Sequence, residues 1–174
     1  PMPGADGTAR AHRLAIPFEN LDIALGRGIS MDHDAIFDKL VTRRRGGYCF
    51  EQNGLFRDAL THLGFDTRML LGRVWLLADD VPPRTHALNL VTLDGEEWIA
   101  DVGFGASFFP PMRLQEGEEA TGPDGVTHRL RRDADHGWML ECRIDGEYRP
   151  QYSFTTDRVS ESDIAMSNHW TATW

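Results

Sequence analysis

Cys49 is the residue whose type and setting best suit covalent chemistry. It lies in the run RRRGGYCFEQNGLF, just after Gly46 and Gly47, which separate two stretches of helical spacing. A thiol attacks as its thiolate, and both the unpaired N–H groups of a helix start and nearby cations favour that form. The backbone N–H groups of Cys49 and Phe50 are also candidate donors to an oxyanion. The competing interpretation is the usual role of a free cysteine, a small buried hydrophobe.

His86 and Asp101 are the candidates for a base and for the group that orients it. His86 begins the strand-like run HALNLVTL, and Asp101 comes near the end of the next such run, EEWIADV. A two-residue turn at Asp94-Gly95 pairs residues whose numbers sum to about 189. His86 and Asp101 then share one face of the hairpin, within reach of a hydrogen bond. With Cys49 they form a candidate Cys–His–Asp triad; the alternative is a structural His–Asp pair inside a barrel.

The remaining histidines stand in polar, loop-like or helix-surface contexts, where solvated or capping roles are the ordinary expectation. They are His12, His33, His62, His128, His136 and His169.

Two helices are expected between residues 32 and 63, where apolar residues recur at helical spacing. The first should carry Arg43, Arg44 and Arg45 in its last turn and end at the glycine pair, because cations suit that end of the helix dipole. Cys49 then opens the second helix.

Short β-like runs follow from residue 65 onward, and two Asp-Gly pairs, at 94–95 and 145–146, mark hairpins. An antiparallel sheet or barrel is therefore predicted. We expect a helical domain over residues 1–64 and a β domain over 65–174, with a loose terminus at 1–10 and a surface loop over 115–124.

Composition excludes several classes of protein. The chain has 174 residues, 41% of them hydrophobic, which is ordinary for a globular fold. A formal charge of −9 argues against a nucleic-acid binder, which needs a basic face. The sequence has no apolar membrane-spanning stretch and no CxxC or HExxH metal pattern. Its two cysteines are expected to be reduced. A cytoplasmic protein without a metal is the expectation.

Four motifs, in order, resemble the signatures of the arylamine N-acetyltransferase family. They are PFENLDI (17–23), RRRGGYCFEQNGLF (43–56), THALNLV (85–91) and IADVGFG (99–105). The likeness extends from about His12 to the end of the chain. It implies an α+β fold: an N-terminal helical domain packed on an antiparallel β-barrel, with a catalytic core like that of papain and the transglutaminases.

The resemblance also implies a reaction. Cys49, His86 and Asp101 take the nucleophile, base and orienter positions. Acetyl-CoA acylates the cysteine, CoA leaves, and a small aromatic amine or hydrazine then receives the acetyl group from the thioester. Two alternatives remain: a papain-like thiol hydrolase, in which water resolves the acyl-enzyme, and a truncated, catalytically idle homologue that serves as an interaction module.

Further site residues follow from the family motifs. Phe18 and Phe104 border the active site in this family and are candidates to pack against the amine, with core packing as the alternative. Gly103 and Gly105 would let the backbone approach the cofactor. Arg45 and Glu51 are expected to form a supporting ion pair beneath the cysteine. Asn53 is expected either to bond nearby backbone or to be solvated.

Two more expectations concern the second half of the chain. Cys142 is interpreted as structural, and the RLRR run at 129–132 either attracts CoA phosphates or lines an exposed strand face. Family members continue into a C-terminal α/β domain that closes the site and contributes to CoA binding. The chain stops at Trp174, so this lid domain is expected to be absent from it, and the apolar surface left exposed would favour a homo-oligomer.

Overall fold

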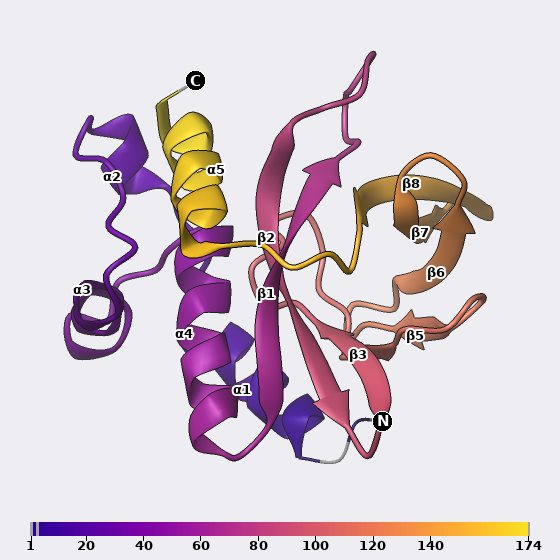
Figure 1. The fold of residues 1–174 in the computed structure, drawn as a ribbon, viewed down its shortest axis with the longest axis horizontal. Coiled ribbons are helices and arrows are strands. Elements are labelled where there is room, and N and C mark those ends of the chain that lie inside the picture. The colour runs from indigo at the N-terminus through magenta and orange to yellow at the C-terminus, as the bar shows by residue number, and fades with distance from the viewer. Residues whose placement is uncertain (1, 3, 174) are drawn as a thin grey trace.

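A layer of helices packs against one side of two long strands, and the remaining strands curl away on the other side (Figure 1). The structure is a computed structural model and describes residue 2 and residues 4–173. Its helices are α1 (Ala5–Ala15), α2 (Leu21–Ala24), α3 (His33–Phe37), the π-helical segment η1 (Asp38–Thr42), α4 (Cys49–His62) and α5 (Glu161–Thr173).

The strands form one antiparallel sheet of eight, in the order β4-β3-β2-β1-β8-β7-β6-β5. Its curvature makes it barrel-like, which confirms the predicted fold class. The strands are β1 (Asp66–Val74), β2 (Arg84–Leu93), β3 (Glu96–Ala100), β4 (Met112–Arg113), β5 (Glu119–Thr121), β6 (Thr127–Asp133), β7 (Gly137–Ile144) and β8 (Glu147–Phe154).

Both predicted hairpins are present. Asp94 and Asp145 have φ angles of 53° and 52°, the left-handed conformation that a two-residue primed turn requires. In the first hairpin Asn89 pairs with Ala100 and Leu90 with Ile99, which is the register expected from the turn. That register carries His86 and Asp101 to the same end of the hairpin.

Three sequence expectations about local structure are wrong. Residues 5–15 form α1, and Met2 is fully buried, so the N-terminal segment is docked through its apolar face. β5 lies inside the expected 115–124 loop. The first helix ends at Thr42, four residues before the glycines, and its last turn is a π-helix that positions Lys39 and Leu40 inward.

Helix α4 is the element that joins the helical layer to the sheet. It packs on β1 and β2, and its residues 49–54 are all buried, polar ones included. Tyr48, Cys49 and Phe50 share an apolar cluster with Ile164 of α5, so the last helix returns to the helical layer beside the cysteine (Figure 1). No helix in the described residues is long and apolar enough to cross a membrane.

Candidate active site

Cys49 lies at the first position of α4 and is 6% exposed. Tyr48, the N-cap residue, has extended backbone angles, so the chain turns sharply into the helix at the cysteine. The thiol lies 3.8 Å from the carbonyl oxygen of Thr85, the residue before His86. The helix start and strand β2 therefore bring the thiol and the imidazole side by side, as the sequence predicts.

His86 and Asp101 form a buried pair. His86 Nε2 donates to Asp101 Oδ2 at 2.7 Å, and both side chains are almost inaccessible to solvent. Because Asp101 occupies Nε2, the other ring nitrogen is left for Cys49, whose side chain is also in hydrogen-bond contact with the imidazole. The structure thus brings together the three residues proposed as a triad.

The charges of this pair reinforce one another. Burial alone would lower the pKa of His86, but the charge and hydrogen bond of Asp101, with a smaller effect from Cys49, raise it to about 10. Burial opposes ionisation of Asp101 as well, yet His86, Asn53 and the Gly103 amide keep the pKa of the carboxyl below its ordinary value. At neutral pH the site therefore holds an imidazolium cation next to the thiol.

Asn53, on α4 one turn after Cys49, holds the carboxylate in place. Its Nδ2 donates to Asp101 Oδ1 at 2.9 Å and to the Ala87 carbonyl at 2.7 Å, and its Oδ1 accepts from the Val102 amide at 3.1 Å. Asn53 is fully buried, so the solvated alternative is wrong. One side chain thus connects the nucleophile helix to β2, which carries His86, and to the segment directly after β3, which carries Asp101.

Tyr152, on β8, is a site residue that the sequence analysis missed. Its ring centroid lies 4.7 Å from that of His86, and the side chain is fully buried. Burial and the nearby charge of Asp101 raise the pKa of the Tyr152 hydroxyl well above its ordinary value. The sequence carried no signal for this contact. It arises because β8 pairs with the distant strand β1 as well as with β7, its neighbour in the chain.

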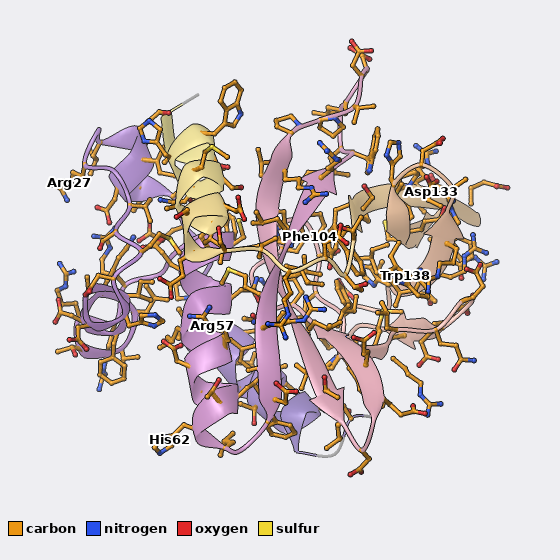
Figure 2. The ribbon with its side chains drawn as sticks, in the orientation of Figure 1. Arg27, Arg57, His62, Phe104, Asp133 and Trp138 are labelled. Carbon is orange, nitrogen blue, oxygen red and sulfur yellow. The ribbon has the colours of Figure 1, made fainter. Side chains whose placement is uncertain are left out.

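The two phenylalanines have different positions. Phe104 lies near the middle of the molecule (Figure 2). It is buried, and its ring lies 5.2 Å from that of His86 and 5.0 Å from that of Tyr152, so it packs on the triad from the core side. Phe18 is 44% exposed and lies against Gly105. Of the two, Phe18 alone is substantially exposed to solvent.

Gly103 and Gly105 both lie close to other parts of the chain, and their expected role as cofactor contacts stays a prediction. A Cβ on Gly103 would lie 2.7 Å from the Cys49 Cα and 2.6 Å from Asn53 Nδ2. A Cβ on Gly105 would lie 3.0 Å from the ring of Phe18. The missing side chain of Gly103 lets the loop after β3 press directly against the start of α4.

Gly103→Ala is expected to lower the melting temperature by several degrees, since overpacking against backbone costs about 1–3 kcal/mol. It should also slow alkylation of Cys49, because the helix start must move. Thermal unfolding and iodoacetamide labelling measure the two effects. Gly7→Ala is the matched control, as its Cβ would meet nothing within 4 Å. A Gly103→Ala protein that behaves like Gly7→Ala would contradict this packing role.

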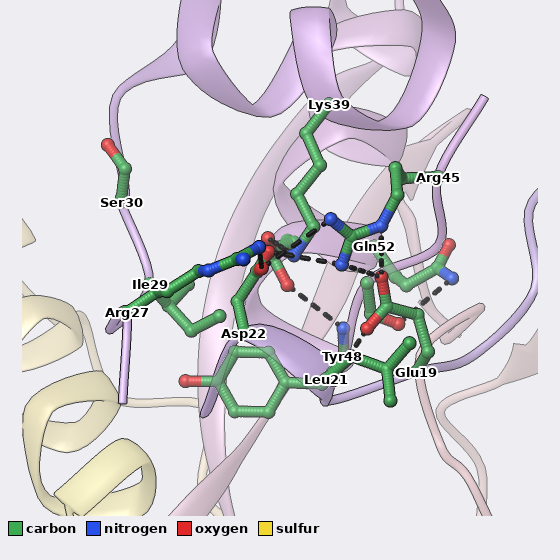
Figure 3. A network of polar contacts seen from close by, with 12 residues as sticks. Glu19, Leu21, Asp22, Arg27, Ile29, Ser30, Lys39, Arg45, Tyr48 and Gln52 are labelled. Atoms are coloured by element: carbon green, nitrogen blue, oxygen red, sulfur yellow. Dashed lines mark hydrogen bonds and ion pairs between the residues drawn. The ribbon is translucent and has the colours of Figure 1, made fainter. Parts of the chain in front are cut away.

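Arg45 and Glu51 do not pair with each other, which corrects the expected ion pair. Arg45 bonds Glu19 at 2.7 Å and Asp22 at 3.2 Å, whereas Glu51 bonds Lys39 at 2.7 Å. Figure 3 shows Lys39 and Arg45 converging on Asp22, which bridges the two pairs. These partners come from the loop after α1, from α2 and from the π-helical turn, and none of them could be located from the motif around Cys49.

The arginines of the 129–132 run are already engaged. Arg129 and Arg131 both bond the buried carboxylate of Glu141, and Arg132 stacks over Trp138 at 3.8 Å. Arg129 and Arg131 therefore lie on the partly exposed face of β6, in agreement with the structural alternative, whereas Leu130 between them is buried in the core. Cys142, on the neighbouring strand, is buried and unpaired by any disulfide.

Two histidines are less solvated than expected. His128 is fully buried and bonds Ser107 Oγ at 2.8 Å, and His12 bonds Gln52 at 2.6 Å from a half-buried position. Burial lowers the pKa of both. Among the described residues no cluster of three or more histidine, cysteine or acidic side chains could hold a metal ion.

The fold and this site define a class: α+β proteins in which a cysteine at a helix start faces a histidine and a carboxylate on a curled antiparallel sheet. Comparison with known proteins places the chain within that class. A model of the N-acetyltransferase family matches residues 7–174. The chain belongs to the arylamine N-acetyltransferase family.

Individual relatives agree with this assignment. The arylamine N-acetyltransferase / N-hydroxyarylamine O-acetyltransferase of Salmonella typhimurium is 46% identical over 166 residues, which is 94% of this chain and 58% of that protein. A solved structure of the enzyme from the same organism superposes with a TM-score of 0.92 at 44% identity, over 98% of this chain and 62% of that one. The Mycobacterium marinum enzyme in complex with CoA gives 0.90 at 36% identity, over 98% and 65%. The chain thus spans about three fifths of the relatives it matches.

Proposed function

We propose that this chain carries the catalytic core of an acetyl-CoA-dependent arylamine N-acetyltransferase, with Cys49 as nucleophile, His86 as base and Asp101 as the residue that orients and charges His86. The observation that carries the proposal is the placement of the Cys49 thiol at the start of α4, in contact with an imidazole that Asp101 holds at 2.7 Å. A structural His–Asp pair needs no thiol at that position.

The first half-reaction uses the imidazolium. The Cys49 thiolate attacks the acetyl carbonyl carbon of acetyl-CoA, and the C–S bond that forms leaves a negative charge on the carbonyl oxygen. The backbone N–H groups of Cys49 and Phe50, at the start of α4, are the proposed donors to that oxygen. Collapse of the intermediate breaks the bond to the CoA sulfur, which takes the proton from His86.

The second half-reaction returns that proton. The amine nitrogen attacks the thioester carbon, and neutral His86 removes its proton. Collapse then expels the Cys49 thiolate and releases the N-acetyl product, so both the thiolate and the imidazolium are restored. Phe18, exposed beside Gly105, is the proposed contact for the aromatic ring of the acceptor. The helical part up to residue 64 thus supplies the nucleophile, and the remainder supplies the base and its orienter.

Intact-mass measurement tests the proposal. The protein is incubated with acetyl-CoA and no acceptor, and is expected to gain the mass of one acetyl group, which aniline then discharges as acetanilide. Cys49→Ala should gain none, whereas Cys142→Ala, which removes the other buried thiol, should behave as the parent.

Other outcomes would overturn it. CoA released continuously without an adduct or an amine would indicate a thiol hydrolase. An unmodified protein with no CoA release would indicate a catalytically idle relative.

A further inference from the structure

A buried ion pair lies at the start of the nucleophile helix. Lys39 Nζ is 2.7 Å from Glu51 Oε1, and the two side chains are 8% and 3% exposed. Lys39 comes from the π-helical turn η1, and Glu51 lies two residues after Cys49 on α4. Charged side chains are rarely buried to this extent unless they are paired.

The two oxygens of Glu51 have different partners. While Oε1 accepts from Lys39, Oε2 accepts from the backbone N–H of Tyr48 at 3.1 Å. Tyr48 is the N-cap of α4 and directly precedes Cys49, so the Glu51 carboxylate fixes the backbone that aims the thiol. Gly47 leaves space for this contact, because a Cβ there would lie 2.9 Å from Oε2.

Lys39 is the cation that neutralises Glu51. Asp22 has other cationic partners, Arg45 at 3.2 Å and Arg27 at 3.5 Å, and Arg45 is shared with Glu19. Among the described residues, by contrast, Lys39 is the one cation in an ion pair with Glu51. Burial raises the pKa of the Glu51 carboxyl even with Lys39 opposing it.

Loss of Lys39 alone would therefore disturb the thiol in either protonation state of Glu51. An ionised Glu51 would place an uncompensated anion in the first turn of α4, next to the position where the thiolate must form. A protonated Glu51 would be a weaker acceptor for the Tyr48 amide, because a charge-assisted hydrogen bond is about twice as strong as a neutral one.

We propose that Lys39 is a positioning residue: it keeps Glu51 as a neutralised cap of the nucleophile helix, so that a neutral residue can replace Lys39 without disturbing the thiol only if Glu51 is made neutral as well. The inference rests on the proposed role of Cys49. Glutamine at position 51 can still accept from the Tyr48 amide as a capping residue, and it carries no charge that needs Lys39.

Alkylation kinetics test this coupling, with Cys142→Ala as the background so that one thiol reports. The rate constant for iodoacetamide is measured at pH 7 and 25 °C by intact mass, for the background protein, Lys39→Met, Glu51→Gln and the double variant. Lys39→Met is expected to slow alkylation roughly 10-fold. Glu51→Gln and the double variant should stay within about 3-fold of the background. Lys39→Gln provides the same comparison if Lys39→Met does not fold.

The outcomes separate this inference from a purely structural role and from the proposed function. A lowered melting temperature with an unchanged alkylation rate would overturn it, and so would a double variant as slow as Lys39→Met. Iodoacetamide reports on the thiol whether or not the protein uses acetyl-CoA. If the expected alkylation pattern is observed but Cys49 is not acetylated, the proposed function is rejected and the inference stands. If Cys49 is acetylated but the alkylation pattern is absent, the inference is rejected and the proposed function stands.

Discussion

Asp101→Asn is expected to slow acetylation of Cys49 by about 10³- to 10⁴-fold while leaving the protein folded. The amide removes the negative charge that holds the imidazolium, and its N–H₂ can face Nε2 of His86 only if the ring gives up its proton there. The pKa of His86, now about 10, would then fall, because the charge of Asp101 is the main influence that raises it. Single-turnover acetylation, followed by intact mass, measures the rate.

Asp145→Asn is the matched control for this substitution. Asp145 lies in a hairpin turn with a positive φ, a conformation that asparagine also adopts readily, and it is remote from the thiol in the β7-β8 hairpin. Cys49 of the Asp145→Asn protein should be acetylated at the parent rate. An Asp101→Asn protein within 10-fold of this control would show that the His86–Asp101 pair is structural and not catalytic.

The free energy of unfolding is expected to fall as the pH rises from about 6.5 towards 10, by up to about 1.4 kcal/mol per pH unit. His86 has a pKa of about 10 in the folded protein against an ordinary value of 6.5, so between these values the folded state holds a proton that the unfolded state has lost. The stabilisation that protonated His86 gives to the folded state is complete below pH 6.5 and is lost as the pH rises through 10. Urea unfolding at a series of pH values measures the slope.

Asp101 contributes to stability with the opposite pH dependence. The pKa of Asp101 is depressed, so its contribution is present above the ordinary value of 3.8 and is lost as the pH falls through the lowered one. His86→Gln should flatten the alkaline slope, whereas His62→Gln, at the exposed end of α4, should not. Subtracting the two slopes removes the contributions of His12 and His128, which both variants share. Equal slopes in the two variants would rule out a raised pKa for His86.

The triad was predictable from sequence because each of its positions depends on a local rule. The glycine pair and the following helical spacing place Cys49 at a helix start. The Asp94-Gly95 turn sets the register of β2 and β3, and so the common face of His86 and Asp101. These rules act over a few residues, where backbone geometry leaves few choices.

Partners that come from distant segments were not predictable. Glu51 was expected to pair with Arg45, six residues away, but the π-helical turn carries Lys39 inward and leaves Arg45 to Glu19 and Asp22. The close approach of Gly103 to the Cys49 backbone was not predicted either. Such choices depend on how the loops are placed once α4 has docked on the sheet.

By itself, then, the sequence determined the family, the α+β class, the placement of Cys49 at a helix start with His86 and Asp101 on one face of a hairpin, and both hairpins, because periodicity, turn chemistry and short motifs are local. Only the tertiary structure decided what supports them: Asn53 bonds Asp101 and β2, Tyr152 packs against His86, and Lys39 pairs with Glu51. The physical reason is that a buried polar group must find a partner, and close packing determines which of several chemically suitable side chains reaches it.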